Sequence, residues 1–162
     1  MFTAWKQNSN GYNKCRQHRP FGAGPPYSRP LLQALELKMP VLTFYNETRE
    51  RFPELTAKAD REHIKYWGEL DPEFAYSWFE SLAKALNAEM SRNIPAKKYA
   101  GIFRHISSAY GKADSEVKNC IDVAFTENLF WQIKEEKAGP YWELLPSNLK
   151  ELYVGFHGKI PL

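Results

Sequence analysis

The stretch from Asp114 to Trp131 constrains the fold of this chain most strongly. Its apolar residues recur three and four positions apart, at Val117, Cys120, Ile121, Ala124, Phe125 and Leu129. This spacing is typical of an α-helix that buries one face. Asp114 is placed to accept hydrogen bonds from the first free backbone N–H groups, and Glu116 adds negative charge where the helix dipole favours it. The stretch therefore predicts a central core helix, but it indicates no activity.

Other segments of the chain show the same helical spacing. We expect helices over residues 39–52, 54–67, 72–91 and 96–110, and a last helix that begins near Ser147. Residues 134–146 are predicted to form a charged connector and a loop. No segment alternates between polar and apolar residues as a strand does. The sequence therefore predicts an all-α fold, a compact bundle of antiparallel helix pairs joined by short loops.

The first 38 residues differ from the rest of the chain. They hold six basic residues and one acidic residue, whereas the remainder has a net charge of −2. Residues 21–30 are dense in glycine and proline, which break regular structure. We therefore expect an irregular, basic arm over residues 1–38 and a helical domain over residues 39–162. The arm is either a contact for nucleic acid or acidic protein, or a nonessential solvated extension, and we favour the extension.

Several classes of protein are not expected from this sequence. No segment approaches the roughly 20 apolar residues that a membrane helix needs, and the beginning of the chain has no continuous apolar run typical of a secretory signal. Cys15 and Cys120 lie far apart in dissimilar contexts, so we expect neither a disulfide nor a metal pair. A cytoplasmic protein fits these observations best.

The histidines give no catalytic or metal-binding signature. His18, His63, His105 and His157 show neither metal-ligand spacing nor an obvious Ser/His/Asp grouping, so no catalytic residue, metal or cofactor is predicted. His63 has the most interesting neighbours, since Glu62 and Glu69 are close in sequence and could support acid–base chemistry. The alternative, which we favour, is a histidine that packs beside Trp67, a residue expected on the inner side of its helix.

Charge is distributed in blocks along the chain. Residues 39–90 hold ten acidic and six basic side chains, whereas residues 91–112 hold five basic and no acidic ones. An acidic face for a basic protein partner is one interpretation, and ordinary surface charge is the other. The candidate partner-binding residues are Glu62, Glu69 and Asp71 around the Trp67–Gly68 bend, with Trp131 and Trp142 as aromatic anchors. The alternative, which we favour, is that both tryptophans close the core. The alternative nucleic-acid contacts are Arg92, Lys97, Lys98 and Arg104.

Two resemblances accompany these observations. The segment Asp114-Ser-Glu-Val-Lys-Asn-Cys-Ile121 resembles the second-helix signature of HEAT-type repeats, Asp-x-x-Val-Arg-x-x-Ala, with the lysine and the isoleucine departing from it. More broadly, residues 39–162 look like a family of small all-helical bacterial proteins. The shared elements are Phe52-Pro-Glu-Leu, Tyr66-Trp-Gly68 before an Asp-Pro helix start, and Tyr141-Trp-x-Leu-Leu-Pro-x-x-Leu-Lys-x-Leu-Tyr153.

The family resemblance implies a helical fold and no catalytic residues. Small helical proteins of this kind are also similar to the immunity proteins that neutralise bacterial toxins. We therefore expect a non-enzymatic protein-binding module, with a bacterial toxin as the particular partner. The alternatives are a nucleic-acid-binding helical protein and an enzyme with a site around His63.

Overall fold

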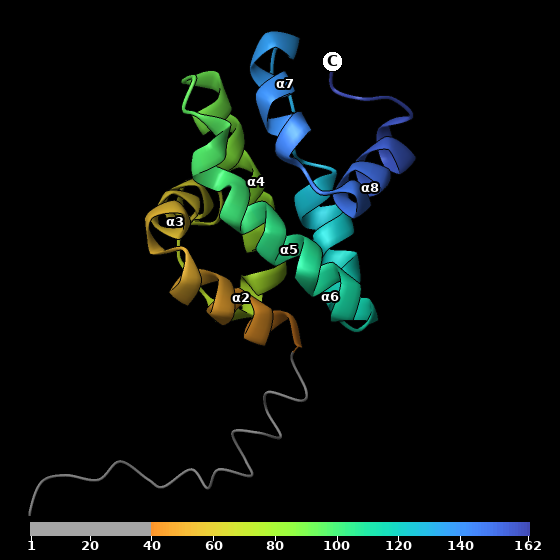
Figure 1. Cartoon of the computed structure of the whole chain (residues 1–162). Helices are drawn as coiled ribbons and strands as arrows, with labels where there is room; N and C mark the ends of the chain where they lie inside the picture. The colour runs from red at the N-terminus through yellow and green to blue at the C-terminus, as the bar shows by residue number, and fades with distance from the viewer. Residues whose placement is uncertain (1–39) are drawn as a thin grey trace, which may run out of the picture.

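The computed structural model describes residues 40–162 and is helical throughout its regular structure (Figure 1). The α-helices are α2 (Pro40–Arg51), α3 (Pro53–Trp67), α4 (Ala75–Ser91), α5 (Ala100–Lys112), α6 (Ser115–Asn119), α7 (Glu135–Leu144) and α8 (Ser147–His157). Short 3-10 helices, η1 (Pro72–Phe74) and η2 (Ala96–Tyr99), precede α4 and α5, and a π-helix, η3 (Cys120–Thr126), follows α6. The described residues contain no strand, so the predicted all-α fold is confirmed. The predicted arm over residues 1–38 lies outside the described residues.

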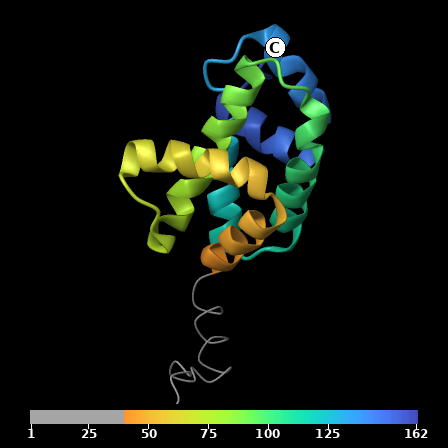
Figure 2. The same cartoon turned by 90° about the vertical axis from the view of Figure 1, so that its left-hand side faces the viewer.

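Helix α4 occupies the centre of the molecule. It packs against α2, α3, α7 and η3. Its inward side chains Trp78, Phe79, Leu82 and Leu86 are almost fully buried. Helices α3 and α4 form the most extensive helix pair, and Figure 2 shows the loop between them projecting from one side of the body. The predicted organising stretch, Asp114–Trp131, shares the core with α4.

The 114–131 stretch buries the expected face but is not one regular α-helix. All six apolar positions that define its stripe are buried, and Asp114 accepts hydrogen bonds from the N–H groups of Glu116 and Val117. Only residues 115–119 are α-helical, and the next seven form η3. The side chain of Thr126 donates to the carbonyl of Ile121, five residues back, at 2.8 Å. This bond spans the wider turn of a π-helix, so a polar side chain stabilises the departure from α geometry.

The end of this stretch is fixed by a side chain from α4. The amide of Asn87 donates to the carbonyl of Asn128, and its oxygen accepts from the N–H of Phe130, both at 2.8 Å. Phe130 and Gln132 have positive φ angles, so the chain turns sharply here. The predicted helix therefore ends before Trp131.

Helix α7 occupies residues where the sequence predicts a connector and a loop. Gly139 and Pro140 lie inside it, and both disfavour a helix interior. Packing overrides this preference, because Ala138, Tyr141 and Trp142 are all buried. The hydroxyl of Tyr141 also donates to the carbonyl of Ile94 at 2.7 Å, which fastens α7 to the loop after α4. The connector prediction is therefore wrong for residues 135–144.

Candidate functional site

The loop end of the α3–α4 pair exposes an unusual number of large apolar side chains. We call this group the tip patch, and its members are Ile64, Tyr66, Trp67, Leu70 and Phe74. Tyr66 and Trp67 are 59% and 48% exposed. The expectation that Trp67 faces inward is therefore wrong, because α3 ends there and its last turn extends beyond the body (Figure 2). Trp67 and Phe74 contact each other, and the ring of Tyr66 is contacted by the ammonium groups of Lys65 and Lys84, 5.3 and 4.3 Å from its centroid. Exposed apolar side chains gathered on a protruding loop are typical of an interaction surface.

The aromatic rings of the tip patch are held in place. The ring of Trp67 stacks on His63 with centroids 5.9 Å apart and on Phe74 with centroids 5.5 Å apart. Gly68 ends α3 with a φ of 86°, a left-handed conformation that favours glycine, and its N–H bonds the carbonyl of Ile64 at 2.8 Å. Asp71 caps η1 through the N–H of Glu73 at 2.9 Å. The Trp67 ring is thus presented in a fixed orientation.

Acidic side chains surround the tip patch as the sequence predicted. Glu62 lies near the end of α3 and is half-buried, Glu69 is exposed in the loop, and Asp71 is half-buried at the cap. Glu73 adds a fourth, exposed carboxylate. Residues 61–74 also contain Arg61 and Lys65, so this segment carries a net charge of −2. The structure therefore places the three predicted carboxylates at one end of the molecule, beside exposed aromatic rings.

His63 lies beneath this patch, in the core. Its side chain is 1% exposed, its Nδ1 lies 3.2 Å from the hydroxyl of Ser81, and its Nε2 has no hydrogen-bond partner among the described residues. Burial lowers the pKa of His63 below its usual range, although the charges of Asp60 and Glu80 act in the opposite direction. The imidazole is therefore a neutral group covered by Trp67, as the packing interpretation predicted.

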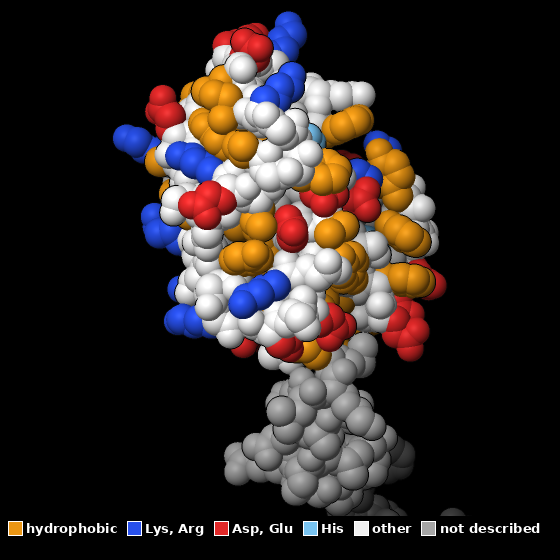
Figure 3. Space-filling model, turned by 90° about the vertical axis from the view of Figure 1, so that its right-hand side faces the viewer, with side chains coloured by type: hydrophobic (Ala, Val, Ile, Leu, Met, Phe, Trp, Pro, Cys, Tyr) orange, Lys and Arg blue, Asp and Glu red, His pale blue; other side chains and the backbone are white. Residues whose placement is uncertain are grey.

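The two other predicted aromatic anchors lie in different environments. Trp131 is 64% exposed, on the turn that follows η3. Trp142 is buried and packs edge to face against Phe130 and Tyr153, so the interpretation that places it at a surface is not supported. Trp131 lies on the rim of a cavity of about 350 Å³ that the C-terminal residues Ile160 and Leu162 also line. Figure 3 shows hydrophobic side chains exposed among charged ones on the face that includes α8.

The four predicted nucleic-acid contacts do not form one free basic patch. Arg92 pairs with Glu89, and the ammonium of Lys98 lies 3.6 Å from the carboxylate of Glu54. Lys97 is exposed on η2. Arg104 lies on α5 and lines a groove, described below, whose smaller cavity Lys98 also lines.

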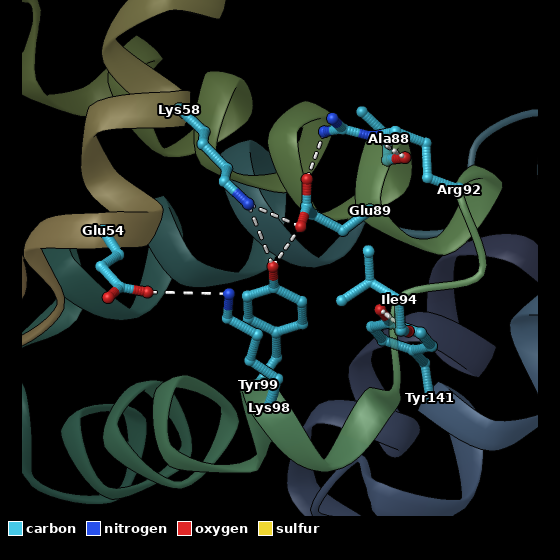
Figure 4. Close-up of polar contacts among 9 residues, drawn as sticks. All are labelled: Glu54, Lys58, Ala88, Glu89, Arg92, Ile94, Lys98, Tyr99 and Tyr141. Atoms are coloured by element: carbon cyan, nitrogen blue, oxygen red, sulfur yellow. Dashed lines mark hydrogen bonds and ion pairs between the residues drawn. The ribbon is translucent and has the colours of Figure 1, made fainter.

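A buried carboxylate anchors the opposite end of the α3–α4 pair (Figure 4). Glu89 of α4 is 1% exposed and accepts from Lys58 of α3 at 2.6 Å, from the hydroxyl of Tyr99 in η2, and from Arg92. Burial raises the pKa of Glu89, but hydrogen bonds from Lys58 and Tyr99 outweigh it and lower the pKa overall. Burial and the neighbouring carboxylate of Glu89 together raise the pKa of Tyr99. An ionised Glu89 therefore joins three elements.

Sequence reasoning missed this cluster. Lys58, Glu89 and Tyr99 are separated by 31 and 10 positions, so no short motif connects them. The one signal was the presence of Glu89 on the apolar side of a helix, next to Met90. A charged residue in such a position is rarely buried unless it is paired.

A groove runs between α2, the start of α3 and α5. It consists of a cavity of about 590 Å³ and a second of about 310 Å³, which share Arg51 and Phe52 in their walls. His105 lines the larger cavity.

Residues 40–162 hold no group of three or more His, Cys, Asp or Glu side chains placed to bind a metal ion. None of the helices in this range is long and apolar enough to cross a membrane.

The fold defines this protein as an all-α domain with an exposed aromatic tip. Residues 45–158 match the family described as Domain of unknown function (DUF7674), and the chain belongs to that family. No curated protein and no solved structure matches the chain. The resemblances to toxin-immunity proteins and to a HEAT-type helix stay predictions.

Proposed function

We propose that this protein is a non-enzymatic protein-binding module that docks its tip patch on a basic surface of a partner protein. The observation that carries this proposal is the exposed, pre-stacked ring of Trp67 among other apolar side chains. Tryptophan and tyrosine are the residues most enriched among the anchors of protein interfaces. A ring that is already held in place loses little conformational entropy on binding.

The chemistry of the partner follows from the carboxylates around the patch. Glu62, Glu69 and Glu73 lie in the same segment as the aromatic rings, and this segment, residues 61–74, carries a net charge of −2. Opposite potentials accelerate the encounter of two proteins, and salt screens this effect. A partner with lysine or arginine side chains around an apolar pocket fits best. A bacterial toxin with a basic active site is the particular case that the sequence suggested, and the acidic surroundings of the patch support a basic partner of any kind.

The test compares the effect on partner binding of removing two exposed aromatic side chains of the tip patch and one exposed tryptophan outside it. Once affinity capture from the native cell has identified a partner, its dissociation constant is measured with purified Trp67→Ala, Tyr66→Ala and Trp131→Ala proteins. We expect the two tip variants to bind at least about tenfold more weakly, since interface anchors typically contribute 2 kcal/mol or more. Trp131→Ala is the matched control, because it removes an exposed tryptophan outside the tip, and its affinity should stay within about twofold of the unaltered protein.

A second measurement examines the charges. Reversing Glu62 and Glu69 to lysine should slow association at low salt and have little effect at high salt. Circular dichroism and thermal unfolding of each variant show whether the helices stay folded. The proposal is wrong if Trp131→Ala weakens binding while the tip variants do not. It also fails if the captured partner is nucleic acid bound through Lys97, Lys98 and Arg104.

A further inference from the structure

The groove between α2, α3 and α5 has the dimensions of a small-molecule site. Its two cavities of about 590 and 310 Å³ lie side by side, because Arg51 and Phe52 belong to the wall of both. Most pockets that bind small ligands have volumes of about 300–1,000 Å³. The tip patch lies at the other end of the 15-residue helix α3, about 20 Å away along the helix axis. The groove is therefore a separate surface.

The larger cavity has a strong excess of positive charge. Arg51, Arg104 and Lys112 line it, and Glu47 is the one acidic residue in its described wall. Among residues 40–162, none of these three cations forms an ion pair, whereas Lys58 and Lys98 of the smaller cavity pair with Glu89 and Glu54. Guanidinium groups bind phosphate through two parallel hydrogen bonds. The guanidinium groups of Arg51 and Arg104 thus suit a group with two negative charges, and Lys112, about 12 Å from Arg104 along the axis of α5, adds positive potential farther along the cavity.

His105 contributes a neutral ring to the same cavity. It packs against Phe44 and Phe52, with centroids 5.6 and 5.5 Å away. The hydroxyl of Thr48 has one proton, which it donates to the carbonyl of Phe44 at 2.7 Å. The contact of 3.1 Å between this hydroxyl and Nε2 of His105 must therefore have the imidazole as donor, which leaves Nδ1 as a hydrogen-bond acceptor. Burial, aided by the charge of Arg51, lowers the pKa of His105, so the ring stays uncharged near neutral pH.

The smaller cavity is more apolar. Its wall includes Phe52, Pro53, Leu55 and Ile102, with Tyr99 beside them. A ligand that reaches from Arg51 and Arg104 past Phe52 would therefore place an apolar part here. Phe52 is fixed in position by the close approach of α5, because a side chain on Gly101 would begin 3.3 Å from its ring. A flat ring is the shape that packs best against such an aromatic wall.

From these features we propose that the groove binds a small organic phosphate that carries a flat ring. The phosphate lies beside Arg51 and Arg104, and the ring lies against Phe52 in the smaller cavity. A hydroxyl group between the two parts of such a ligand matches the acceptor that His105 retains. A mononucleotide combines these three groups and is the natural probe.

The test is a calorimetric titration with AMP, ribose 5-phosphate, adenosine and inorganic phosphate. We expect AMP to bind with a sub-millimolar dissociation constant, and each of the other three to bind at least about tenfold more weakly, because each lacks at least one part of the ligand. Arg104→Gln should weaken AMP binding about tenfold or more. Arg61→Gln is the matched control, since Arg61 is exposed on α3 outside the groove, and its affinity should stay within about twofold.

Four results would overturn the proposal. The first is no heat with AMP at 5 mM, about five times the upper limit of the expected dissociation constant. The second is equal affinity for AMP and inorganic phosphate, which would indicate an adventitious ion only. The third is an AMP affinity that Arg104→Gln leaves unchanged. A single-stranded oligonucleotide that binds far more tightly than AMP would also replace the small-molecule site with a nucleic-acid surface. The first three results do not bear on the tip patch, because its test uses different variants, whereas an oligonucleotide bound through Lys98 and Arg104 would also contradict the proposed protein-binding function.

Discussion

The two ends of the α3–α4 pair are joined by different kinds of polar contact. At the end near the body, Lys58 of α3 and Glu89 of α4 form a buried ion pair that Tyr99 and Arg92 complete. Near the tip, His63 of α3 meets Ser81 of α4 through one neutral contact, and Nε2 of His63 is left without a partner among the described residues. The first end is held by a carboxylate that is almost fully buried, whereas at the second the neutral contact of His63 is accompanied by a bond of 2.8 Å from the indole N–H of Trp78 to the less buried carboxylate of Asp60.

This difference fits the proposed roles of the two ends. A buried charge that is fully partnered permits one arrangement of its neighbours, because any displacement leaves it unpaired. The helices and η2 are therefore fixed relative to one another at Glu89. The tip patch needs no such network, since its rings are ordered by stacking on His63 and Phe74. The tip patch, which is the proposed interaction surface, and the cluster around Glu89 are thus stabilised by separate sets of contacts.

The largest expected effect comes from the charged end. Glu89→Gln keeps the size of the side chain but removes the charge that Lys58 and Arg92 face. We expect a loss of roughly 3 kcal/mol in the free energy of unfolding, near the low end for breaking a buried ion pair, because Lys58 and Arg92 can reach solvent. Denaturant titration measures it. The control is Glu80→Gln, which breaks a half-exposed pair with Lys84 and should cost at most about 0.5 kcal/mol. Equal losses in the two variants would contradict the comparison.

A smaller loss is expected near the tip. Ser81→Ala removes the partner of Nδ1 in His63 and leaves a second ring nitrogen unsatisfied in the core. The expected loss is about 1 kcal/mol, the usual net value of one neutral hydrogen bond. Ser77→Ala is a matched control on the same helix, because its hydroxyl bonds the carbonyl of Phe74 at the surface. A loss for Ser81→Ala as large as that for Glu89→Gln would mean that the two ends are held equally.

The contrast also shows where sequence reasoning succeeds. The buried stripe of residues 114–131 and the cap at Asp114 were predictable, because helical spacing and capping are local properties. The carboxylates around the Trp67–Gly68 bend were predictable for the same reason. The spacing did not predict the path of the backbone after Asn119. The apolar residues of η3 stay buried although the helix is a π-helix, and hydrogen bonds of the Thr126 and Asn87 side chains redirect the chain.

Features that depend on distant partners were missed. Helix α7 contains Gly139 and Pro140, and burial of Tyr141 and Trp142 against other helices outweighs that local preference. The ion pair between Lys58 and Glu89 and the groove between α2 and α5 arise only when separate helices meet. The helical spacing also predicted that Trp67 faces inward. Spacing does not show where a helix extends beyond the helices against which it packs, and Trp67 lies in such a last turn.

The smallest expected effect is on the pH dependence of the free energy of unfolding, to which His63 near the tip and Glu89 at the other end contribute in different pH ranges. Burial lowers the pKa of His63 in the folded protein, so the unfolded chain binds more protons below about pH 6.5, the usual value of histidine. Stability should therefore fall as pH decreases from 6.5 toward the lowered folded value. Glu89 also has a lowered pKa, but its contribution is lost only below about pH 4.5, as pH falls toward the folded value.

The measurement is the free energy of unfolding between pH 7.5 and 5, for the unaltered protein and for His63→Gln. We expect the variant to lose less stability across this range, because glutamine does not titrate, while His105, whose pKa is also lowered by burial, still contributes to both curves. Glu89→Gln should instead keep the same slope as the unaltered protein above pH 5 and differ below about pH 4.5. Parallel curves for His63→Gln and the unaltered protein would show that His63 is not held neutral at the tip, and the comparison between the two ends would then rest on the ion pair alone.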